Sequence, residues 1–502
     1  MNEIVSAART CEPIASFSNS YARLPGRFFA RLEPTPVEDP HLVQFNARLA
    51  TELGLNLAGL DADTLAGIFA GNLIPPGAEP IAMAYAGHQF GAFVPALGDG
   101  RAILLGEIID RQGVRRDIQL KGSGRTPYSR LGDGRATLGP MLREYLISEA
   151  MHALGIASTR SLAVVSTGER VYRERALPGA MLTRVAASHV RVGTFEYFAA
   201  RTDLDAIQRL VDYVIERHYP EAREAAEPLW ALLRAVADRQ AQLIARWMHV
   251  GFIHGVMNTD NMAISGQSID YGPCAFMDAY DPATVFSSID QFGRYAYGNQ
   301  PRIAQWDLAC FAQTLLPLLD ADPARAVERA NEMLGALPAL FARYWLEGMR
   351  GKLGLLLAED QDLQLAQSLL EAMYRNNADF TLTFRRLCDA ADSAQADAGV
   401  RALFSNPSQF DEWAARWRLR LSREPRQPGE RAQAMRGVNP AFIPRNHRVE
   451  AALEAAVVRA DLAPFTELLQ VLSRPYDEQS AYAAYAQPPL PEQRVLQTFC
   501  GT

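Results

Sequence analysis

The spacing of apolar and polar residues changes character along the chain. As far as Pro95 the pattern is irregular and proline-rich, with one helix predicted over residues 42–53 and closed by Gly54. From Ala96 onward, short alternating runs predict strands around a single helix with one broad apolar face. The predicted elements are a glycine-rich turn and strand at 98–107, a strand at 117–121, a helix at 140–154, and strands at 161–165 and 180–183.

Beyond about Val192 the pattern becomes mainly helical. Residues 204–214 keep the spacing of an amphipathic helix, and a long helix is predicted over 228–250, directly before His254. Residues 262–269 predict two short strands about a Ser-Gly turn. Further helices are predicted over 306–319, 324–337 and 363–374, and a polar break at 424–429 precedes a C-terminal helical extension.

This order of elements is typical of protein kinases. A glycine turn with its strand, a strand ending in lysine, a helix carrying glutamates and further strands make a kinase N-lobe, and a long helix leads into the catalytic loop of the C-lobe. The sequence therefore predicts an α/β (α+β) fold of the kinase-like two-lobe type. The predicted divisions are an N-terminal arm wrapping the lobes (1–95), an N-lobe (96–192), a C-lobe (193–423) and a helical C-terminal extension (424–502).

One stretch carries the most specific chemical signal. Kinases place His-Arg-Asp-x-x-x-x-Asn shortly before Asp-Phe-Gly, and the Asn and second Asp hold the magnesium ions that bridge the nucleotide phosphates. His254, Asn261 and Asp270 fall in register with that pattern, but Val256 stands in place of the catalytic Asp. Because valine cannot accept a proton, the usual base is lost. Asp260, beside Asn261, could be a general base, a support for the metal ligand, or a solvent-exposed bystander.

A lysine and a glutamate complete the kinase comparison. In kinases a Lys–Glu ion pair positions the lysine on the nucleotide phosphates. Lys121 ends a predicted strand, and Glu144 and Glu149 on the following helix compete to pair with it. The helical wheel favours Glu149, which lies in the middle of the apolar face.

Other candidates for nucleotide binding are glycines and arginines. Gly98 and Gly100 would let backbone amides approach phosphate, and Arg101 adds charge. Arg184 and Arg191 are seven residues apart, so they share one face if the segment is helical and could clamp a phosphate. The loop residues Asp133 and Gly134 could reach the base or ribose. Each of these also has an ordinary interpretation as a turn or surface residue.

Composition and charge exclude several classes of protein. The chain has 502 residues, is 48% hydrophobic and 21% charged, and carries a net charge of −7, which indicates a soluble globular protein. The acidic balance gives no electrostatic reason to expect nucleic acid or an anionic membrane as partner. Residues 1–20 contain no apolar run typical of a signal peptide, and nothing approaches the ~18 apolar residues of a membrane span. We expect a cytoplasmic protein.

The five cysteines are scattered and form no CxxC pair, which argues against a zinc site or a disulfide scaffold. Cys274 follows the Asp270-Tyr-Gly stretch and Cys500 lies near the end of the chain. They could be a buried small residue and an unlinked tail thiol, or a redox-sensitive bridge between the tail and the active site.

The motifs together resemble the selenoprotein O family, protein adenylyltransferases with a pseudokinase fold. The resemblance covers nearly the whole sequence. It is carried by FSNSYARLP (17–25), YAGHQFG (85–91), LGDGRA (97–102), QLKGSGRTPYSR (119–130), DGRA (133–136), REYL (143–146), the stretch 254–278, NP (439–440), RNH (445–447) and PYD (475–477).

This resemblance implies an inverted ATP, whose α-phosphate faces the acceptor, and transfer of AMP to a Ser, Thr or Tyr hydroxyl of a protein with release of pyrophosphate. It also assigns roles: Asp260 as proton acceptor, Glu144 as partner of Lys121, and Cys500 at the position that is selenocysteine in many eukaryotic members. It further implies that Asn261 and Asp270 bind metal, and that the nucleotide is contacted by Gly98, Gly100, Arg101, Lys121, Asp133, Gly134, Arg184, Arg191 and Asp270.

The expected function is therefore protein AMPylation that depends on Mg²⁺, with Mn²⁺ as the alternative ion, and uses ATP and hydroxyl-bearing proteins as substrates. Two alternatives stay open: an orthodox phosphotransferase with Asp260 as a displaced base, and a catalytically inactive ATP-binding scaffold.

Overall fold

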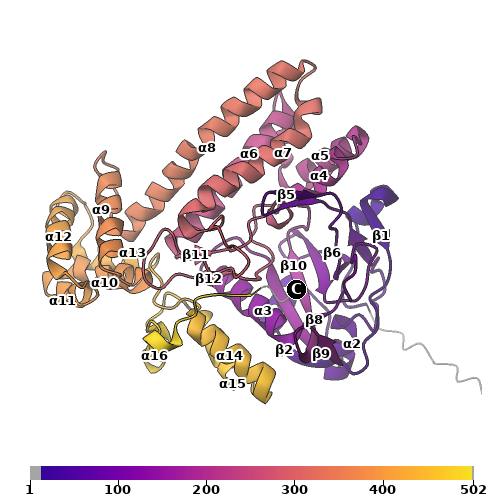
Figure 1. Ribbon diagram of the computed structural model, residues 1–502, viewed down its shortest axis with the longest axis horizontal. Helices are drawn as coiled ribbons and strands as arrows, with labels where there is room; N and C mark the ends of the chain where they lie inside the picture. The colour runs from indigo at the N-terminus through magenta and orange to yellow at the C-terminus, as the bar shows by residue number, and fades with distance from the viewer. Residues whose placement is uncertain (1–12, 500–502) are drawn as a thin grey trace, which may run out of the picture.

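The computed structural model describes residues 13–499 of the chain, and its β part is built around one antiparallel sheet (Figure 1). Eight strands form this sheet, in the order β1-β3-β6-β7-β10-β9-β2, with β8 paired to β10. Their bounds are β1 (Phe29–Arg31), β2 (His41–Phe45), β3 (Ile81–Met83), β6 (Ala102–Ile109), β7 (Arg115–Lys121), β8 (Ala136–Thr137), β9 (Arg160–Tyr172) and β10 (Ala176–Ala186).

The N-terminal segment supplies strands at both edges of this sheet. β1 and β3 extend the sheet beyond β6, and β2 pairs with β9 at the other edge. The irregular pattern predicted for this region is therefore wrong in part, because strands of three to five residues are too short to show alternation. The helix predicted over 42–53 is likewise only half correct. Residues up to Phe45 belong to β2, which pairs with β9. The helix α1 (Ala47–Leu53) starts only at Ala47, and Asn46 caps its N-terminus by accepting a hydrogen bond from the Leu49 amide.

Successive residues of the strands face two different hydrophobic cores. Leu104, Val164 and Leu182 face α3 (Leu138–Ala153), whereas their neighbours Leu105, Val165 and Met181 pack with α1 and α2 (Ala62–Phe69). α3 is covered on its other side by α14 (Asn446–Arg459) and α15 (Ala463–Leu472). The C-terminal extension therefore closes over the helix that packs on the sheet.

The remaining helices make the larger, helical part of the molecule (Figure 1). The long helices α6, α7 and α8 pack against one another, α4 packs on both α5 and α7, and α10 packs on α13. Their bounds are α4 (Val192–Ala199), α5 (Leu204–His218), α6 (Pro228–His249), α7 (Gln300–Leu319), α8 (Pro323–Lys352), α9 (Asp362–Arg375), α10 (Phe380–Asp392), α11 (Asp397–Arg401), α12 (Pro407–Leu421), α13 (Pro428–Arg436) and α16 (Ala483–Ala486).

Most of the predicted helices are confirmed, with two corrections nearby. α8 continues to Lys352, well past the predicted end at residue 337, with Pro338 inside it. The two strands predicted over 262–269 are wrong. Ala263 and Ser268 instead make single bridges to Arg191 and Ser158, so this loop pairs with distant backbone rather than with itself. Two small hairpins complete the described chain, β4 (Gly87–Gln89) with β5 (Ala92–Val94), and β11 (Phe252–Ile253) with β12 (Ala275–Phe276).

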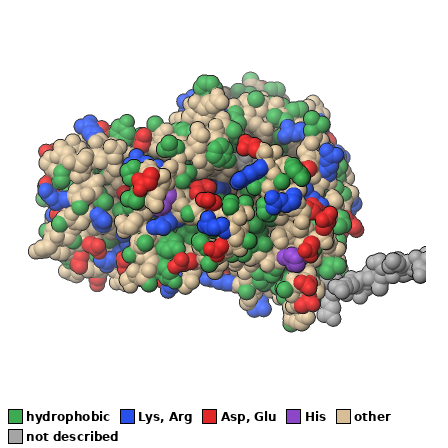
Figure 2. All heavy atoms as spheres, turned by 60° about the horizontal axis from the view of Figure 1, so that its bottom comes forward, with side chains coloured by type: hydrophobic (Ala, Val, Ile, Leu, Met, Phe, Trp, Pro, Cys, Tyr) green, Lys and Arg blue, Asp and Glu red, His purple; other side chains and the backbone are tan. Residues whose placement is uncertain are grey.

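The mixed architecture is of the α+β type. On the face presented in Figure 2, basic and acidic side chains are interspersed, with apolar side chains scattered between them. Within residues 13–499, every helix is too short or too polar to traverse a lipid bilayer.

Lys352 is a buried cation at the end of α8, and it should make the stability of the fold depend on pH. Burial lowers its pKa from 10.5 to about 7, and its Nζ lies 4.2 Å from the ring centroid of Phe384. The unfolded chain therefore binds one more proton between about pH 7 and pH 10.5, so the free energy of unfolding should rise with pH across that window. Lys352→Met should remove this slope and raise the free energy of unfolding at pH 6.5 by ~1–3 kcal/mol. Chemical denaturation at several pH values measures both effects, and an unchanged slope would contradict the assignment.

Candidate active site

A cleft of about 860 Å³ lies between the sheet, α3 and the loop that follows β11. Side chains from elements far apart in the sequence meet there, because β7, β10 and α3 all direct residues toward this loop. The cleft is lined by all twelve residues selected from the sequence for nucleotide, metal or proton binding: Gly98, Gly100, Arg101, Lys121, Asp133, Gly134, Glu144, Arg184, Arg191, Asp260, Asn261 and Asp270.

The centre of the cleft is a cluster of paired charges around Asp270. Lys121 Nζ lies 2.7 Å from Asp270 Oδ1 and 2.7 Å from Glu144 Oε2. Arg184 Nη2 donates to the same Asp270 oxygen at 2.5 Å, and Arg191 Nη1 donates to Asp270 Oδ2 at 2.6 Å. Three cations thus converge on one carboxylate.

Strand register explains how Lys121 and Arg184 come together. Lys121 lies opposite Leu182, and Gln119 lies opposite Arg184, so both cations project from the α3 face of neighbouring strands. The segment that joins Arg184 and Arg191 is not helical, the condition under which their spacing would put them on one face, because Arg184 belongs to β10 and Arg191 immediately precedes α4. They nevertheless meet at Asp270.

The structure places Glu144, and not Glu149, against Lys121. Glu144 also accepts from Arg184 Nε at 2.8 Å, while Glu149 pairs with Arg160 at 2.7 Å and accepts from Asn46. α3 is buried on several sides. A helical wheel that assumes a single apolar face therefore cannot decide which of the two glutamates points toward Lys121.

The charges of the cluster shift its acid–base equilibria. Burial alone would raise the pKa of Asp270, but Arg184, Lys121 and Arg191 outweigh it and hold that pKa well below its usual range. Arg184 and Lys121 likewise lower the pKa of Glu144 against the effect of burial. Both carboxylates are therefore ionised at neutral pH.

The loop after β11 holds the remaining polar groups. His254 Nε2 lies 2.9 Å from the Ile269 carbonyl, and its ring stacks on Trp247, so His254 is a structural support. Asn261 Nδ2 donates to the Val256 carbonyl at 3.0 Å, which leaves its side-chain oxygen as an acceptor for the cleft. Asp260 is 8% exposed, and its Oδ1 has no hydrogen-bond partner among the described residues. Burial raises the pKa of Asp260 to about 6, although Arg191 opposes the shift.

The β4–β5 hairpin covers Asp260. The Gln89 side chain lies close enough to the Asp260 carboxylate to lower its pKa. A side chain on residue 87 would place its Cβ 2.4 Å from Asp260 Oδ1, so only glycine fits there. No local residue pattern singles out Gly87 or Gln89, although both lie in the stretch 85–91 that carries the family resemblance.

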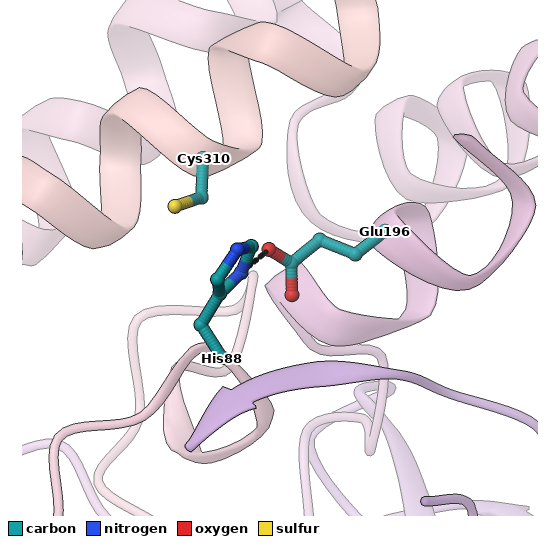
Figure 3. A group of neighbouring side chains, drawn as sticks. All are labelled: His88, Glu196 and Cys310. Atoms are coloured by element: carbon teal, nitrogen blue, oxygen red, sulfur yellow. Dashed lines mark hydrogen bonds and ion pairs between the residues drawn. The ribbon is translucent and has the colours of Figure 1, made fainter. Parts of the chain in front are cut away.

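His88 of this hairpin lies against two side chains of the helical part, Glu196 and Cys310 (Figure 3). His88 Nδ1 lies 2.6 Å from Glu196 Oε1, and Glu196 Oε2 accepts from the Thr259 hydroxyl at 2.5 Å. Cys310 approaches the same pair, with ligand atoms of all three residues within 4.8 Å of one another. Both oxygens of Glu196 already accept hydrogen bonds within the protein, from His88 and Thr259. Glu196 therefore connects the hairpin to the segment that carries Asp260.

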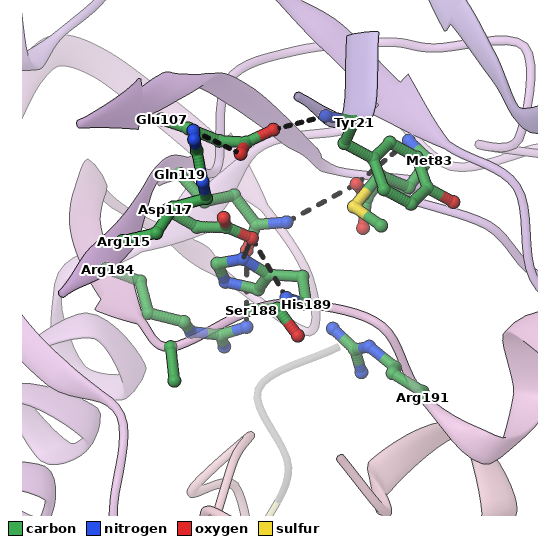
Figure 4. A network of polar contacts seen from close by, with 12 residues as sticks. Tyr21, Met83, Glu107, Arg115, Asp117, Gln119, Arg184, Ser188, His189 and Arg191 are labelled. Carbon is green, nitrogen blue, oxygen red and sulfur yellow. Dashed lines mark hydrogen bonds and ion pairs between the residues drawn. The ribbon is translucent and has the colours of Figure 1, made fainter. Parts of the chain in front are cut away.

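A second polar network lies behind the arginines (Figure 4). Gln119 Oε1 accepts from Arg184 Nη1 at 3.3 Å, and Gln119 Nε2 donates to Asp99 Oδ2 at 3.3 Å. Asp117 lies 2.9 Å from His189 Nδ1 and binds Arg217. Asp99 lines the cleft, and burial raises its pKa to about 6. Because these buried groups are linked, the position of Arg184 depends on the whole central sheet.

The glycine-rich turns shape the mouth of the cleft. Gly98 has φ +64°, and a Cβ there would overlap the Tyr128 ring; Gly134 has φ +71°, and a Cβ there would lie 2.0 Å from the Gly124 carbonyl oxygen. Asp133 lines the cleft but pairs with Arg173 at 2.7 Å, in an exposed position.

Cys274 is fully buried directly after the Asp270 loop, and Cys500 lies outside the described residues. The last described residues nevertheless approach this loop. Thr498 pairs with Ser287, and its hydroxyl donates to the Pro273 carbonyl at 2.5 Å.

The donors in the cleft suit a hard divalent cation. Asp270 and the Asn261 amide oxygen are oxygen ligands of the kind that Mg²⁺ and Mn²⁺ prefer. These residues therefore fit the metal that the sequence predicts.

Comparison with known proteins identifies the family. A family model described as "Protein adenylyltransferase SelO" matches residues 14–473. A "Protein nucleotidyltransferase YdiU" from Rhizobium meliloti (strain 1021) is 64% identical, with 97% of this chain and 99% of the relative covered. The proteins of that name from Bradyrhizobium diazoefficiens (64% identical, 97% and 99% covered) and Rhizobium etli strain CIAT 652 (62%, 99% and 100%) are similarly related. With the family model and these relatives spanning nearly the whole sequence, the chain belongs to the SelO family of protein adenylyltransferases.

Proposed function

We propose that this protein transfers AMP from ATP to Ser, Thr or Tyr hydroxyls of other proteins and releases pyrophosphate, in a cleft of the kinase-like two-lobe type. The observation that carries the proposal is the convergence of Lys121, Arg184 and Arg191 on Asp270, beside Asn261 and with Val256 in the place of a kinase base. Residues 96–192 and 193–423 would form the two lobes, with 1–95 and 424–502 as extensions.

The depth of the arginines supports an inverted nucleotide. Arg184 is 1% exposed and Arg191 3% exposed, so the greatest positive charge lies at the closed end of the cleft. A triphosphate is drawn to that charge, and its β- and γ-phosphates then occupy the buried end. This arrangement turns the α-phosphate toward the open side, where an acceptor can reach it.

Asp260 is positioned to accept the proton of the acceptor. Its side chain lines the cleft, and a pKa of about 6 leaves it mostly ionised at neutral pH yet more basic than an ordinary carboxylate. The acceptor oxygen attacks the α-phosphorus as the bond to the bridging oxygen of the β-phosphate breaks, and pyrophosphate leaves with that oxygen. The hydroxyl proton passes to Asp260.

Asn261 and Asp270 would hold the divalent ion. That ion supplies charge neutralisation for the phosphates when bound. Lys121, Arg184 and Arg191 are close enough to Asp270 to exchange it for phosphate oxygens when the nucleotide enters. A regulatory link between Cys274 and Cys500, and a location in the cytoplasm, remain predictions from the sequence.

The labelled phosphate of ATP distinguishes the proposed reaction from its alternatives. Incubation of the purified protein and purified candidate acceptor proteins with α-labelled ATP should give labelled protein, whereas γ-labelled ATP should give none, because pyrophosphate leaves. Label from the γ position only would indicate a kinase, and label from neither would indicate a binding scaffold.

Asp270→Asn should abolish transfer, because the cations and the divalent ion lose the charge around which they assemble. EDTA should abolish transfer by the unmodified protein, and Mg²⁺ or Mn²⁺ should restore it. Glu149→Gln, a charge removal on α3 outside the cluster, is the matched control and should retain activity. If the Asp270 variant labels protein at the normal rate, our metal assignment is wrong.

Asp260→Asn should reduce the rate of transfer by roughly 10²–10⁴, the usual contribution of a general base. ATP affinity, measured by calorimetry, should change much less, since the substitution keeps the shape of the side chain. An unchanged rate would leave Asp260 as a structural residue only.

A further inference from the structure

A groove of about 550 Å³ adjoins the cleft. It is lined by residues 289–294, which precede α7, together with Phe90, Arg302 and Ile303. None of the candidate catalytic or nucleotide-binding residues lines it, so the groove is available to something other than ATP.

The groove is continuous with the catalytic cleft. Phe90 and Ile289 line both cavities. Phe90 belongs to the turn of the β4–β5 hairpin that covers Asp260, and its backbone amide donates to Asn258 Oδ1 at 3.0 Å. A polypeptide whose hydroxyl reaches Asp260 would therefore continue past Phe90 into the groove.

The wall of the groove exposes large apolar side chains. Phe292 is 96% exposed and Ile289 is 56% exposed, whereas the neighbouring Ile303 is almost buried. An aromatic side chain that stays exposed to water does not contribute the stability that its burial would give the fold. Exposed apolar groups beside a cavity are typical of binding surfaces. The groove thus offers a partner an apolar contact.

The charge of the groove is positive. Arg302 is exposed and has no ion-pair partner within residues 13–499, and Arg294 lies with its guanidinium 4.7 Å from the Trp306 ring centroid. The one acidic side chain of the wall, Asp290, is turned inward and accepts from the backbone amides of Arg294 and Tyr295 at 2.9 and 2.8 Å. The exposed guanidinium group of Arg302 is therefore left to attract an acidic partner.

We propose that this groove binds the acceptor protein as an extended segment that carries a large apolar side chain and an acidic side chain close to the modified hydroxyl. The inference rests on the proposed AMP transfer, because it assigns the groove to the second substrate of that reaction.

Synthetic fluorescent peptides test the groove independently of catalysis. Each peptide contains Ser, Thr and Tyr, flanked within a few residues by Phe or Ala and by Glu or Lys. Binding to the full-length protein is followed by fluorescence anisotropy, and transfer is followed with α-labelled ATP. We expect the Phe/Glu peptides to bind about tenfold more tightly than the Ala/Lys peptides and to show a correspondingly lower KM.

Two variants and two controls locate the effect. Phe292→Ala should remove the preference for Phe over Ala, and Arg302→Glu should reverse the preference from Glu to Lys, each with KM for ATP unchanged. Leu419→Ala truncates an exposed apolar side chain of α12, and Arg416→Glu reverses an exposed positive charge of the same helix. Both control variants should keep both preferences.

The outcomes separate the two proposals. Peptide binding without preference, or preferences that survive in Phe292→Ala and Arg302→Glu, would overturn the groove assignment whatever the activity. Selective peptide binding that the variants abolish would support the groove assignment, whatever the labelling result. Absence of α-label from both peptide and protein would overturn the proposed AMP transfer and leave the groove assignment standing.

Discussion

The neutralisation of one buried carboxylate organises this molecule. Asp270 is held by Lys121, Arg184 and Arg191, which come from two strands of the sheet and from the start of α4. Buried charges are costly unless they are paired, so each partner depends on the others being in place. In the proposed reaction, the same cations would release Asp270 to a metal ion and bind phosphate instead. Folding and the proposed nucleotide binding would then draw on the same set of charges.

The N-terminal segment is part of this arrangement rather than an appendage. It contributes β1, β2 and β3 to the sheet that carries Lys121 and Arg184, and its β4–β5 hairpin covers Asp260. The C-terminal helices α14 and α15 cover α3, which carries Glu144. Both ends of the described chain thus contribute to the structure around the cleft.

The sequence alone predicted the parts of the site that are close together along the chain. His254, Asn261 and Asp270 could be found because one loop carries them at a fixed spacing, and α5 and α6 because their apolar periodicity is long. Properties that depend on distant pairing could not be found. The meeting of Arg184 with Lys121 could not be found because the pairing of β10 with β7 is not visible locally, and β2 was missed because it becomes a strand only beside β9.

The burial of Lys121 has a practical consequence. The sequence contains two lysines, Lys121 and Lys352, and both side chains are almost wholly inaccessible to solvent. The basic side chains on the surface are consequently arginines, which amine-directed reagents do not acylate. An ATP analogue that delivers an acyl group from its terminal phosphate would meet Lys121 at the inner end of the cleft with almost no competing amines. Acylation of that single side chain in the purified protein would then report occupancy and orientation of the nucleotide without any acceptor protein.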